Sequence, residues 1–214
     1  MLFDKARNLY LRYQLKGFIG PKYKGFFGKF KLYVQSLTGH VEIVSCAEPG
    51  TWKMNPEKLN PGIRIEIIEC LDGSIKYLEE MSKAYHRDFR SDWERYFSWG
   101  QVLCVALLEG KLASFGWIQD GRKRARCHYI RLSPGEYRLT RAGVLPGFRN
   151  KNIHTTRHSL MLSHLFSSGA TRVFVDAFAD NEYSWRGHFS AGYQEFGRVF
   201  VRKTITGKEY IRWL

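Results

Sequence analysis

The stretch Val144-Leu-Pro-Gly-Phe-Arg-Asn-Lys-Asn-Ile-His154 carries the strongest structural signal of the chain. It joins a predicted strand, Glu136 to Val144, to a predicted helix that begins near Asn152, through a tight turn at its Pro-Gly pair. Such a helix start leaves several backbone N–H groups unpaired, and the helix dipole favours negative charge beside them. The stretch therefore predicts a site for an anion such as a pyrophosphate. Positive charge around it would come from Arg149, Lys151 and Arg157.

Regular elements are predicted on both sides of this stretch. Before it, the pattern indicates a strand, two helices and a hairpin, over residues 63–70, 74–86, 91–99, 101–109 and 112–119. After the helix at 152–168 it indicates a strand, a helix, a strand and a paired last strand, over residues 171–178, 181–191, 193–203 and 209–214. A hairpin followed by alternating strands and helices predicts an α/β (mixed α+β) fold with a mixed central sheet.

This order of elements, together with two motifs, resembles the GNAT superfamily of acyl-CoA-dependent N-acyltransferases over roughly residues 63–203. Val144-Leu-Pro146 followed by Arg149-Asn-Lys-Asn-Ile-His154 is similar to the family's Val-x-Pro and Gln/Arg-x-x-Gly-x-Gly/Ala loop. Asn181-x-x-Ser184, ending in Gly192-Tyr193, is similar to the family's Asn-x-x-Ala helix that closes on Gly-Phe. The resemblance implies a GNAT-like central mixed β-sheet flanked by helices, with a basic N-terminal arm before it.

The resemblance also implies acetyl-CoA or another acyl-CoA as donor, and no metal. A strand that splays from its neighbour near Val144 would pair with the pantetheine arm. Two positions depart from the family motif, because Asn152 and His154 stand where small residues are usual. Asn tolerates unusual backbone angles, whereas His154 would either contact a phosphate or obstruct it. The expected cofactor-binding residues are Gly143, Val144, Leu145, Arg149, Asn150, Lys151, Asn152, Ile153, His154, Thr155, Asn181 and Ser184.

Transfer of an acyl group to an amine needs a proton donor for the departing thiolate. Members of the resembled family often use a Tyr seven residues after the Asn of the second motif, a position that is His188 here. Histidine can donate a proton near neutral pH, so His188 is the first candidate acid. Tyr183, two residues after Asn181, is the second.

The amine must in turn lose a proton, to a base or through water. Asp176 interrupts the apolar run from Val173 to Phe178, and a carboxylate in such a place requires a partner or a function. It is therefore the first candidate base, and Glu136 is the second. The structural alternative is an ion pair of Asp176 with Arg172 or Arg198.

Charge is concentrated at the N-terminus. The chain holds 34 Lys and Arg against 20 Asp and Glu, and residues 1–34 alone carry eight basic side chains and one acidic one. Residues 48–62 are rich in Pro and Gly and indicate a linker, so we divide the chain into a basic N-terminal helix, arm and linker (1–62) and an acyltransferase domain (63–214). The amphipathic pattern over residues 2–19 suggests that the arm binds an anionic membrane surface or an acyl carrier protein. Nucleic-acid binding, through this arm and the basic run at 122–126, is the less favoured alternative.

These features lead to an expected function. The chain would move an acetyl or other acyl group from acyl-CoA to an amino sugar, a small amine or a peptide amine, in the cytoplasm or at the membrane periphery. One alternative is an acyl-ACP-dependent or membrane-surface acyltransferase of an envelope or polysaccharide pathway. Another is a non-catalytic nucleic-acid-binding or GNAT-like scaffold protein. The four cysteines lack metal-ligand spacing, and a homodimer is left open.

Overall fold

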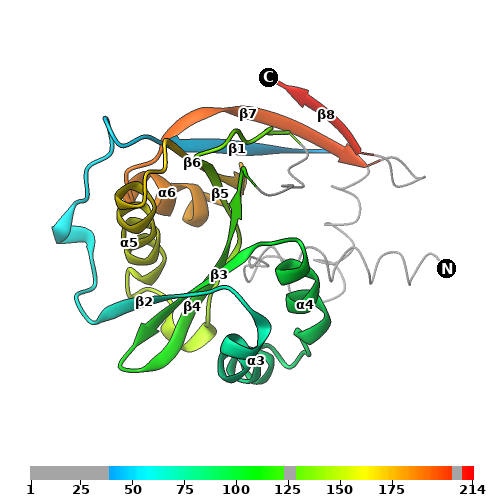
Figure 1. The fold of residues 1–214 in the computed structure, drawn as a ribbon. Coiled ribbons are helices and arrows are strands. Elements are labelled where there is room, and N and C mark those ends of the chain that lie inside the picture. The colour runs from blue at the N-terminus through cyan, green and yellow to red at the C-terminus, as the bar shows by residue number, and fades with distance from the viewer. Residues whose placement is uncertain (1–38, 123–128, 204–208) are drawn as a thin grey trace.

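A computed structural model describes residues 39–122, 129–203 and 209–214 (Figure 1). Their strands form one eight-stranded sheet in the order β2-β3-β4-β5-β6-β1-β7-β8. All pairs are antiparallel except β5 and β6, which are parallel, so the prediction of a mixed sheet is confirmed. The strands are β1 (His40–Ala47), β2 (Ile63–Ile68), β3 (Val102–Leu108), β4 (Lys111–Asp120), β5 (Glu136–Val144), β6 (Arg172–Phe178), β7 (Gln194–Lys203) and β8 (Glu209–Trp213).

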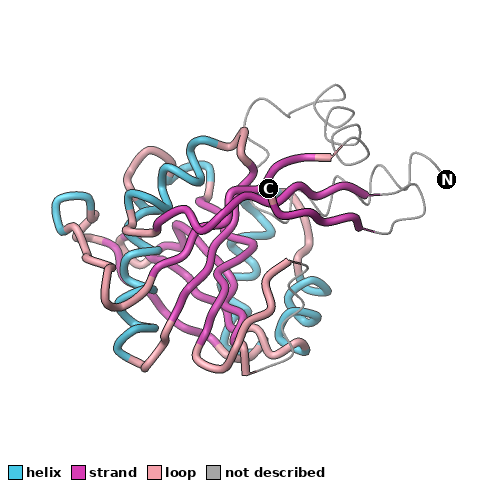
Figure 2. The backbone as a smooth tube through the Cα atoms, turned by 90° about the horizontal axis from the view of Figure 1, so that it is seen from above, coloured by secondary structure: helices cyan, strands magenta, loops and turns pink. Residues whose placement is uncertain are grey.

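The four α-helices of the described residues lie on both sides of the sheet, as Figure 2 shows from above. They are α3 (Leu71–Tyr85), α4 (Arg90–Ser98), α5 (Ile153–Ser167) and α6 (Glu182–Ser190), and two short 3₁₀ turns are η2 (Pro56–Lys58) and η3 (Pro146–Phe148). Every element predicted between residues 63 and 214 is present, with ends within a few residues of the prediction. No helix in the described part of the chain is long and apolar enough to cross a bilayer. The predicted helix at 2–19 and most of the basic run at 122–126 lie outside the described residues.

Strand β1 was not predicted, yet it occupies the interior of the sheet. It pairs antiparallel with β6 on one side, where Val44 faces Asp176, and with β7 on the other. Six of its eight residues are buried. The sheet therefore includes residues on the N-terminal side of Ile63, and the division of the chain at this residue remains a prediction.

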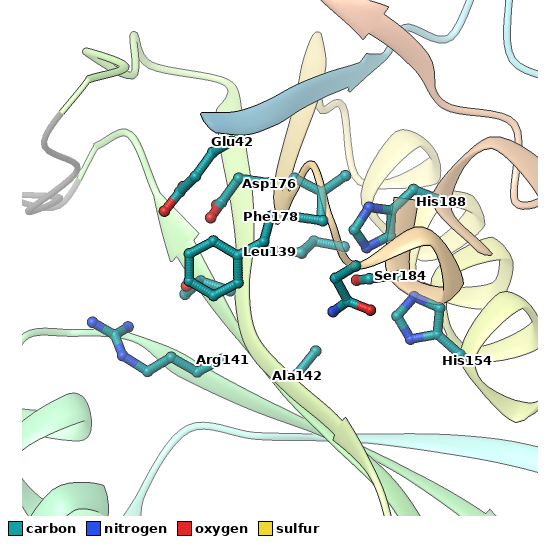
Figure 3. A pocket seen from close by; sticks show the side chains of 13 residues that line it. Glu42, Leu139, Arg141, Ala142, His154, Asp176, Phe178, Ser184 and His188 are labelled. Atoms are coloured by element: carbon teal, nitrogen blue, oxygen red, sulfur yellow. The ribbon is translucent and has the colours of Figure 1, made fainter. Parts of the chain in front are cut away.

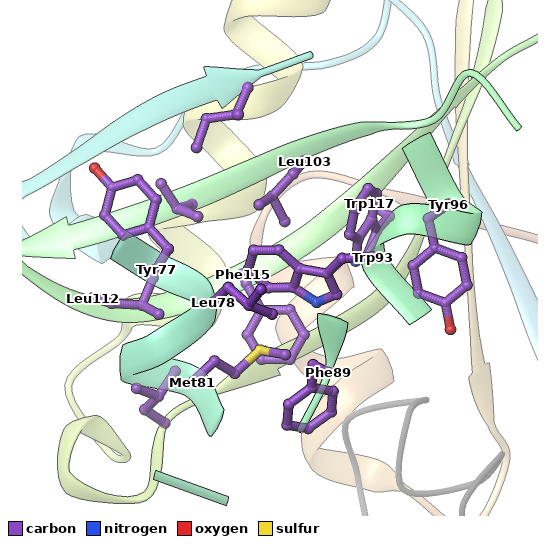
Figure 4. Close-up of a cluster of buried hydrophobic side chains, with 13 residues drawn as sticks. Tyr77, Leu78, Met81, Phe89, Trp93, Tyr96, Leu103, Leu112, Phe115 and Trp117 are labelled. Carbon is purple, nitrogen blue, oxygen red and sulfur yellow. The ribbon is translucent and has the colours of Figure 1, made fainter. Parts of the chain in front are cut away.

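The two faces of the sheet are covered by different helices. On one face α3 and α4 bury an aromatic cluster, in which Trp93 of α4 meets Trp117 of β4 edge to face at a centroid distance of 5.7 Å (Figure 4). On the other face α5 packs Met161 and Leu162 against Leu139 and other residues of β5 and β6. Burial of apolar area on both faces stabilises the layered fold at roughly 25 cal/mol per Å².

Strand β5 contains one extra residue, and this bulge shapes the sheet. The register with β4 shifts between Phe115 and Trp117, so that Gly116 lies opposite both Arg141 and Ala142. Arg141 adopts a left-handed backbone with φ 49°. Such bulges bend the strand that contains them. The parallel pairing of β5 with β6 runs from Glu136 only as far as Leu139, and the two strands diverge beyond it.

The central place of β1 can be tested by truncating one of its side chains. Val44→Ala is expected to lower the free energy of unfolding by about 1–2 kcal/mol more than Val41→Ala, because Val44 is fully buried and Val41 is not. Chemical denaturation of both variants measures the difference. Equal costs at the two positions would contradict the position of β1 inside the sheet.

Candidate active site

A pocket lies where β5 and β6 diverge (Figure 3). The space at this opening is about 520 Å³, part of it open solvent, and it is lined by residues 139–142 of β5 and 175–178 of β6. Side chains from three other elements complete the lining: Glu42 of β1, His154 of α5, and Ser184 and His188 of α6, with Asn181 just before α6. Both predicted motifs therefore contribute to the pocket, the first through His154 and the second through Asn181 and Ser184.

The predicted anion loop connects this pocket to the start of α5. Asn150 and Asn152 adopt left-handed backbones with φ 62° and 55°, so Asn supplies here the conformation for which glycine is the usual residue. The helix starts at Ile153 and has no side-chain cap, which leaves the N–H groups of its first turn for a ligand. Arg149 and Lys151 are exposed beside them. The loop has the geometry and charge of an anion site.

His154 lies in the first turn of α5 and lines the pocket. Its ring packs between α5 and α6, against the rings of His158 and His188 at centroid distances of 4.5 and 5.1 Å. A Cβ atom on Gly187 would approach His154 Cδ2 to 2.5 Å, so the two helices meet closely only because residue 187 is glycine. We call His154, His158 and His188 the histidine cluster.

Burial keeps the histidine cluster uncharged. Desolvation lowers the pKa of His154 and His158 well below the ordinary 6.5, and lowers the pKa of His188 to about 3. The positive charge of Arg157 adds to all three shifts. This corrects the expectation that His188 gives up a proton as an imidazolium near neutral pH. A neutral imidazole still donates one N–H, and His188 Nδ1 has no hydrogen-bond partner among the described residues.

Arg157 was expected near the anion loop, but its side chain is only 1% exposed. Its guanidinium donates to the Phe115 carbonyl beside the bulge, to Ser114 Oγ at 2.7 Å and to His158 Nε2 at 2.9 Å. Because arginine only donates, His158 must accept at Nε2 and carry its proton on Nδ1, which faces the Tyr193 hydroxyl at 3.3 Å. Arg157 therefore ties α5 to the bulged strands and fixes the His158 tautomer.

The histidine cluster also contains the nitrogen donors of a metal site, since one ring atom from each of the three residues lies within 4.8 Å of the others. Neutral imidazoles of this kind suit Zn²⁺. Two features oppose such an ion. The lone pair of His158 Nε2 already accepts from Arg157, and that guanidinium would place a second positive charge in a buried space.

Asp176 stands at the other end of the pocket, and its partner is Arg138. The guanidinium donates from Nε at 2.9 Å and from a terminal nitrogen at 2.5 Å, both times to Oδ1. The expected alternatives, Arg172 and Arg198, pair instead with Glu136 and Glu195. Arg138 also donates to the Tyr129 hydroxyl at 2.9 Å, and Tyr129 donates to Glu42. We call Glu42, Tyr129, Arg138 and Asp176 the acidic network.

Two predicted catalytic residues lie away from the pocket lining. Glu136 is buried at the start of β5, where it pairs with Arg172 and accepts the Ser133 N–H at 2.8 Å. Tyr183 is 87% exposed on α6. Neither position supports the catalytic roles that we expected for these residues. Glu42 was missed, although it interrupts the apolar strand β1 in the same way as Asp176 interrupts β6.

The other predicted cofactor-binding residues lie along the pocket and the loop. Gly143 and Val144 end the bulged strand, Leu145 follows it, and the Gly143 carbonyl accepts from Ser114 Oγ at 2.7 Å. Thr155 lies in the first turn of α5, and Asn181 takes the N-cap position of α6 without capping it through its side chain. Of the expected set, His154, Asn181 and Ser184 line the pocket, whereas Val144, Leu145 and Ile153 are buried in the hydrophobic core.

Comparison with solved structures places this architecture among known folds. The chain is similar to an acetyltransferase of the GNAT family from Colwellia psychrerythraea, with a TM-score of 0.55 and 12% identity, over 80% of this chain and 59% of that one. It is also similar to a GCN5-related glucosamine N-acetyltransferase region of a fungal multi-domain β-N-acetylglucosaminidase, with a TM-score of 0.56 and 11% identity, over 82% and 22% of the two chains.

A third similar structure is AAC(6')-Ib in complex with ribostamycin and coenzyme A, with a TM-score of 0.53 and 14% identity, over 70% of this chain and 91% of that one. The chain spans less than two thirds of the length of the first two proteins. No family model and no curated protein sequence matches it. The described residues therefore have the fold of the GNAT acetyltransferases, as the sequence motifs predicted.

The neutral histidine cluster makes stability depend on pH. The unfolded chain binds protons near the ordinary pKa of 6.5 and the folded chain does not, so stability is complete above that pH and is lost as the pH falls below it. The loss is about 1.4 kcal/mol per pH unit for each histidine. Unfolding at about pH 5.5 should therefore take up about three more protons than unfolding at about pH 8.

Calorimetric unfolding in two buffers with different ionisation enthalpies measures this uptake. A His188→Asn variant is expected to take up about one proton fewer, because one of the three groups is gone. Equal proton uptake at the two pH values would contradict a neutral, buried cluster.

Proposed function

We propose that this chain is an N-acyltransferase that uses acyl-CoA as donor and binds it in the opening between β5 and β6. One observation carries the proposal: the only parallel pair of the described sheet separates after Leu139, directly beside an uncapped helix start with a basic loop. The similarity to GNAT acetyltransferase structures supports the same donor. One of these structures contains coenzyme A.

The donor would use two parts of the site. The N–H groups at the start of α5, with Arg149 and Lys151, suit the pyrophosphate. The backbone of residues 140–144, which β6 leaves unpaired on one side, suits the amides of the pantetheine arm. Asn181 and Ser184 would contact that arm from α6, since both line the pocket.

The acceptor amine would attack the thioester carbonyl, so that a C–N bond forms and the C–S bond breaks. Asp176 would take the amine proton, because both bonds from Arg138 reach Oδ1 and the carboxylate lines the pocket. His188 would donate a hydrogen bond from its neutral ring to the departing thiolate, which then takes a proton from solvent. The proton on Asp176 returns to solvent and restores the base.

The acceptor class is an amine. An amino sugar is one candidate, since a similar structure is described as a glucosamine N-acetyltransferase region and another contains ribostamycin. A small amine or a peptide amine remains compatible with the pocket. Binding of the N-terminal arm to anionic lipid or to an acyl carrier protein stays a prediction for residues outside the described part.

Donor binding can be tested by calorimetric titration with CoA and acetyl-CoA. We expect binding, and we expect Arg149→Ala with Lys151→Ala to weaken it by about 100-fold or more, the range of two charge-assisted contacts. Arg202→Ala with Arg212→Ala removes the same charge from exposed positions on β7 and β8 and should leave the affinity unchanged. A protein that binds neither ligand would be a scaffold without this donor site.

The proposal that Asp176, and not Glu136, is the general base can be tested by substituting each residue. Asp176→Asn is expected to lower kcat by about 10²- to 10⁴-fold without changing CoA affinity, because general-base catalysis is lost. Glu136→Gln should keep kcat, since Glu136 lies outside the pocket lining. Thiol release from acetyl-CoA over a pH series measures both. Full turnover of Asp176→Asn at every pH would show that water alone removes the proton.

A further inference from the structure

Arg141 occupies the bulge of β5 in a conformation that its backbone does not favour. Its φ of 49° is left-handed, a region in which glycine or asparagine is the less strained residue. The backbone of the bulge therefore gives no reason for a long cationic side chain here. Strained positions of this kind concentrate at functional sites, and Arg141 lines the pocket.

The guanidinium of Arg141 is held in place by neutral groups. It lies 4.4 Å from the ring centre of Tyr96 and 5.9 Å from that of Trp99, and it donates to Gln101 Oε1 at 3.0 Å. Stacking and one hydrogen bond orient the side chain but leave most of its five N–H donors for another partner. Arg141 is therefore positioned without being neutralised.

No carboxylate of the described residues lies within ion-pair distance of Arg141. Three other arginines, by contrast, have carboxylate partners. Arg138 pairs with Asp176, and Arg95 and Arg87 both pair with Asp92. Burial lowers the pKa of Arg141, which marks the cost of holding this charge away from water. Asp176 attracts this charge from beyond ion-pair distance. A partly buried cation that no carboxylate contacts favours an anionic ligand.

The position of this charge within the pocket indicates which ligand it would serve. In Figure 3 the side chains of Arg141, Asp176 and Glu42 extend to one side, while His154, Ser184 and His188 lie on the other. The histidine side adjoins the start of α5 and the donor loop. Arg141 and Asp176 thus place a positive and a negative group together on the side away from the donor loop, where the acceptor would enter.

We propose that the acceptor carries an acidic group, a carboxylate or a phosphate, beside its amine, and that Arg141 binds this acidic group while Asp176 faces the amine. The inference rests on the proposed function and narrows its acceptor to amines that are also anions. Glu42 is not expected to bind the acceptor amine in place of Asp176, because both of its oxygens already accept hydrogen bonds. One pairs with His40 at 3.0 Å and the other accepts from Tyr129.

Matched acceptor pairs test this proposal with acetyl-CoA as donor. We expect β-alanine to exceed β-alaninamide, or glucosamine 6-phosphate to exceed glucosamine, by about 10- to 100-fold in kcat/KM, the range of one charge-assisted contact. The first pair tests recognition of a carboxylate, and the second tests recognition of a phosphate. The gain should appear mainly in KM, because Arg141 binds the acceptor away from the reacting atoms.

Variants assign the preference to Arg141. Arg141→Met should reduce the acidic acceptor to the level of its neutral counterpart, and Arg141→Lys should restore part of the difference. Arg95→Met is the matched control, because Arg95 stacks on the same two rings at 5.5 Å but is exposed and does not line the pocket. It should keep the full preference. CoA affinity is measured for each variant, so that a change in acceptor preference is separated from a change in donor binding.

The outcomes separate this inference from the proposed function. Failure of the wild-type protein to bind CoA would overturn both. CoA binding with equal kcat/KM within each pair, or a preference that survives in Arg141→Met, would overturn the inference alone. If no pair turns over, the shift in the unfolding midpoint of CoA-saturated protein replaces turnover, and equal shifts for acidic and neutral members overturn the inference.

Discussion

The single extra residue in β5 is the constraint on which the rest of the site depends. Because Gly116 faces two residues instead of one, β5 bends away and its parallel pairing with β6 ends at Leu139. The carbonyl of Phe115 beside the bulge accepts from the buried guanidinium of Arg157, which also reaches the histidine cluster. A local irregularity of one strand is thus tied to α5, and the sheet keeps an opening that regular pairing would close.

The opening is electrostatically divided. On one side, burial keeps three histidines neutral beside a fixed positive charge, so this side offers polar contacts and positive potential without an acid that titrates near neutral pH. On the other side, Arg138 holds one oxygen of Asp176, and Arg141 stands without a carboxylate partner. The phosphates of the donor suit the positive side at α5, and the acceptor's amine and acidic group suit Asp176 and Arg141 on the other side. The pocket therefore favours one orientation of the two substrates.

Features that depend on residues close together in the sequence were predicted correctly. Features that depend on pairing between distant segments were missed. The Pro-Gly turn, the uncapped helix start and Asp176 within an apolar run are properties of neighbouring residues, and each takes the predicted position. Strand β1 escaped prediction because its partners, β6 and β7, lie more than a hundred residues away in sequence. The partner of Asp176 and the role of Arg141 depend on register across β4, β5 and β6, which local patterns do not encode.

The central claim is that the unpaired stretch of β5 and the start of α5 together form the donor site. Hydrogen–deuterium exchange with and without CoA tests it at the backbone groups concerned. The account predicts slower exchange at residues 140–144 and 153–155 when CoA binds, with β7 and β8 unchanged, because the ligand would occupy N–H groups that the fold leaves open. CoA binding that leaves exchange at both segments unaltered would contradict it.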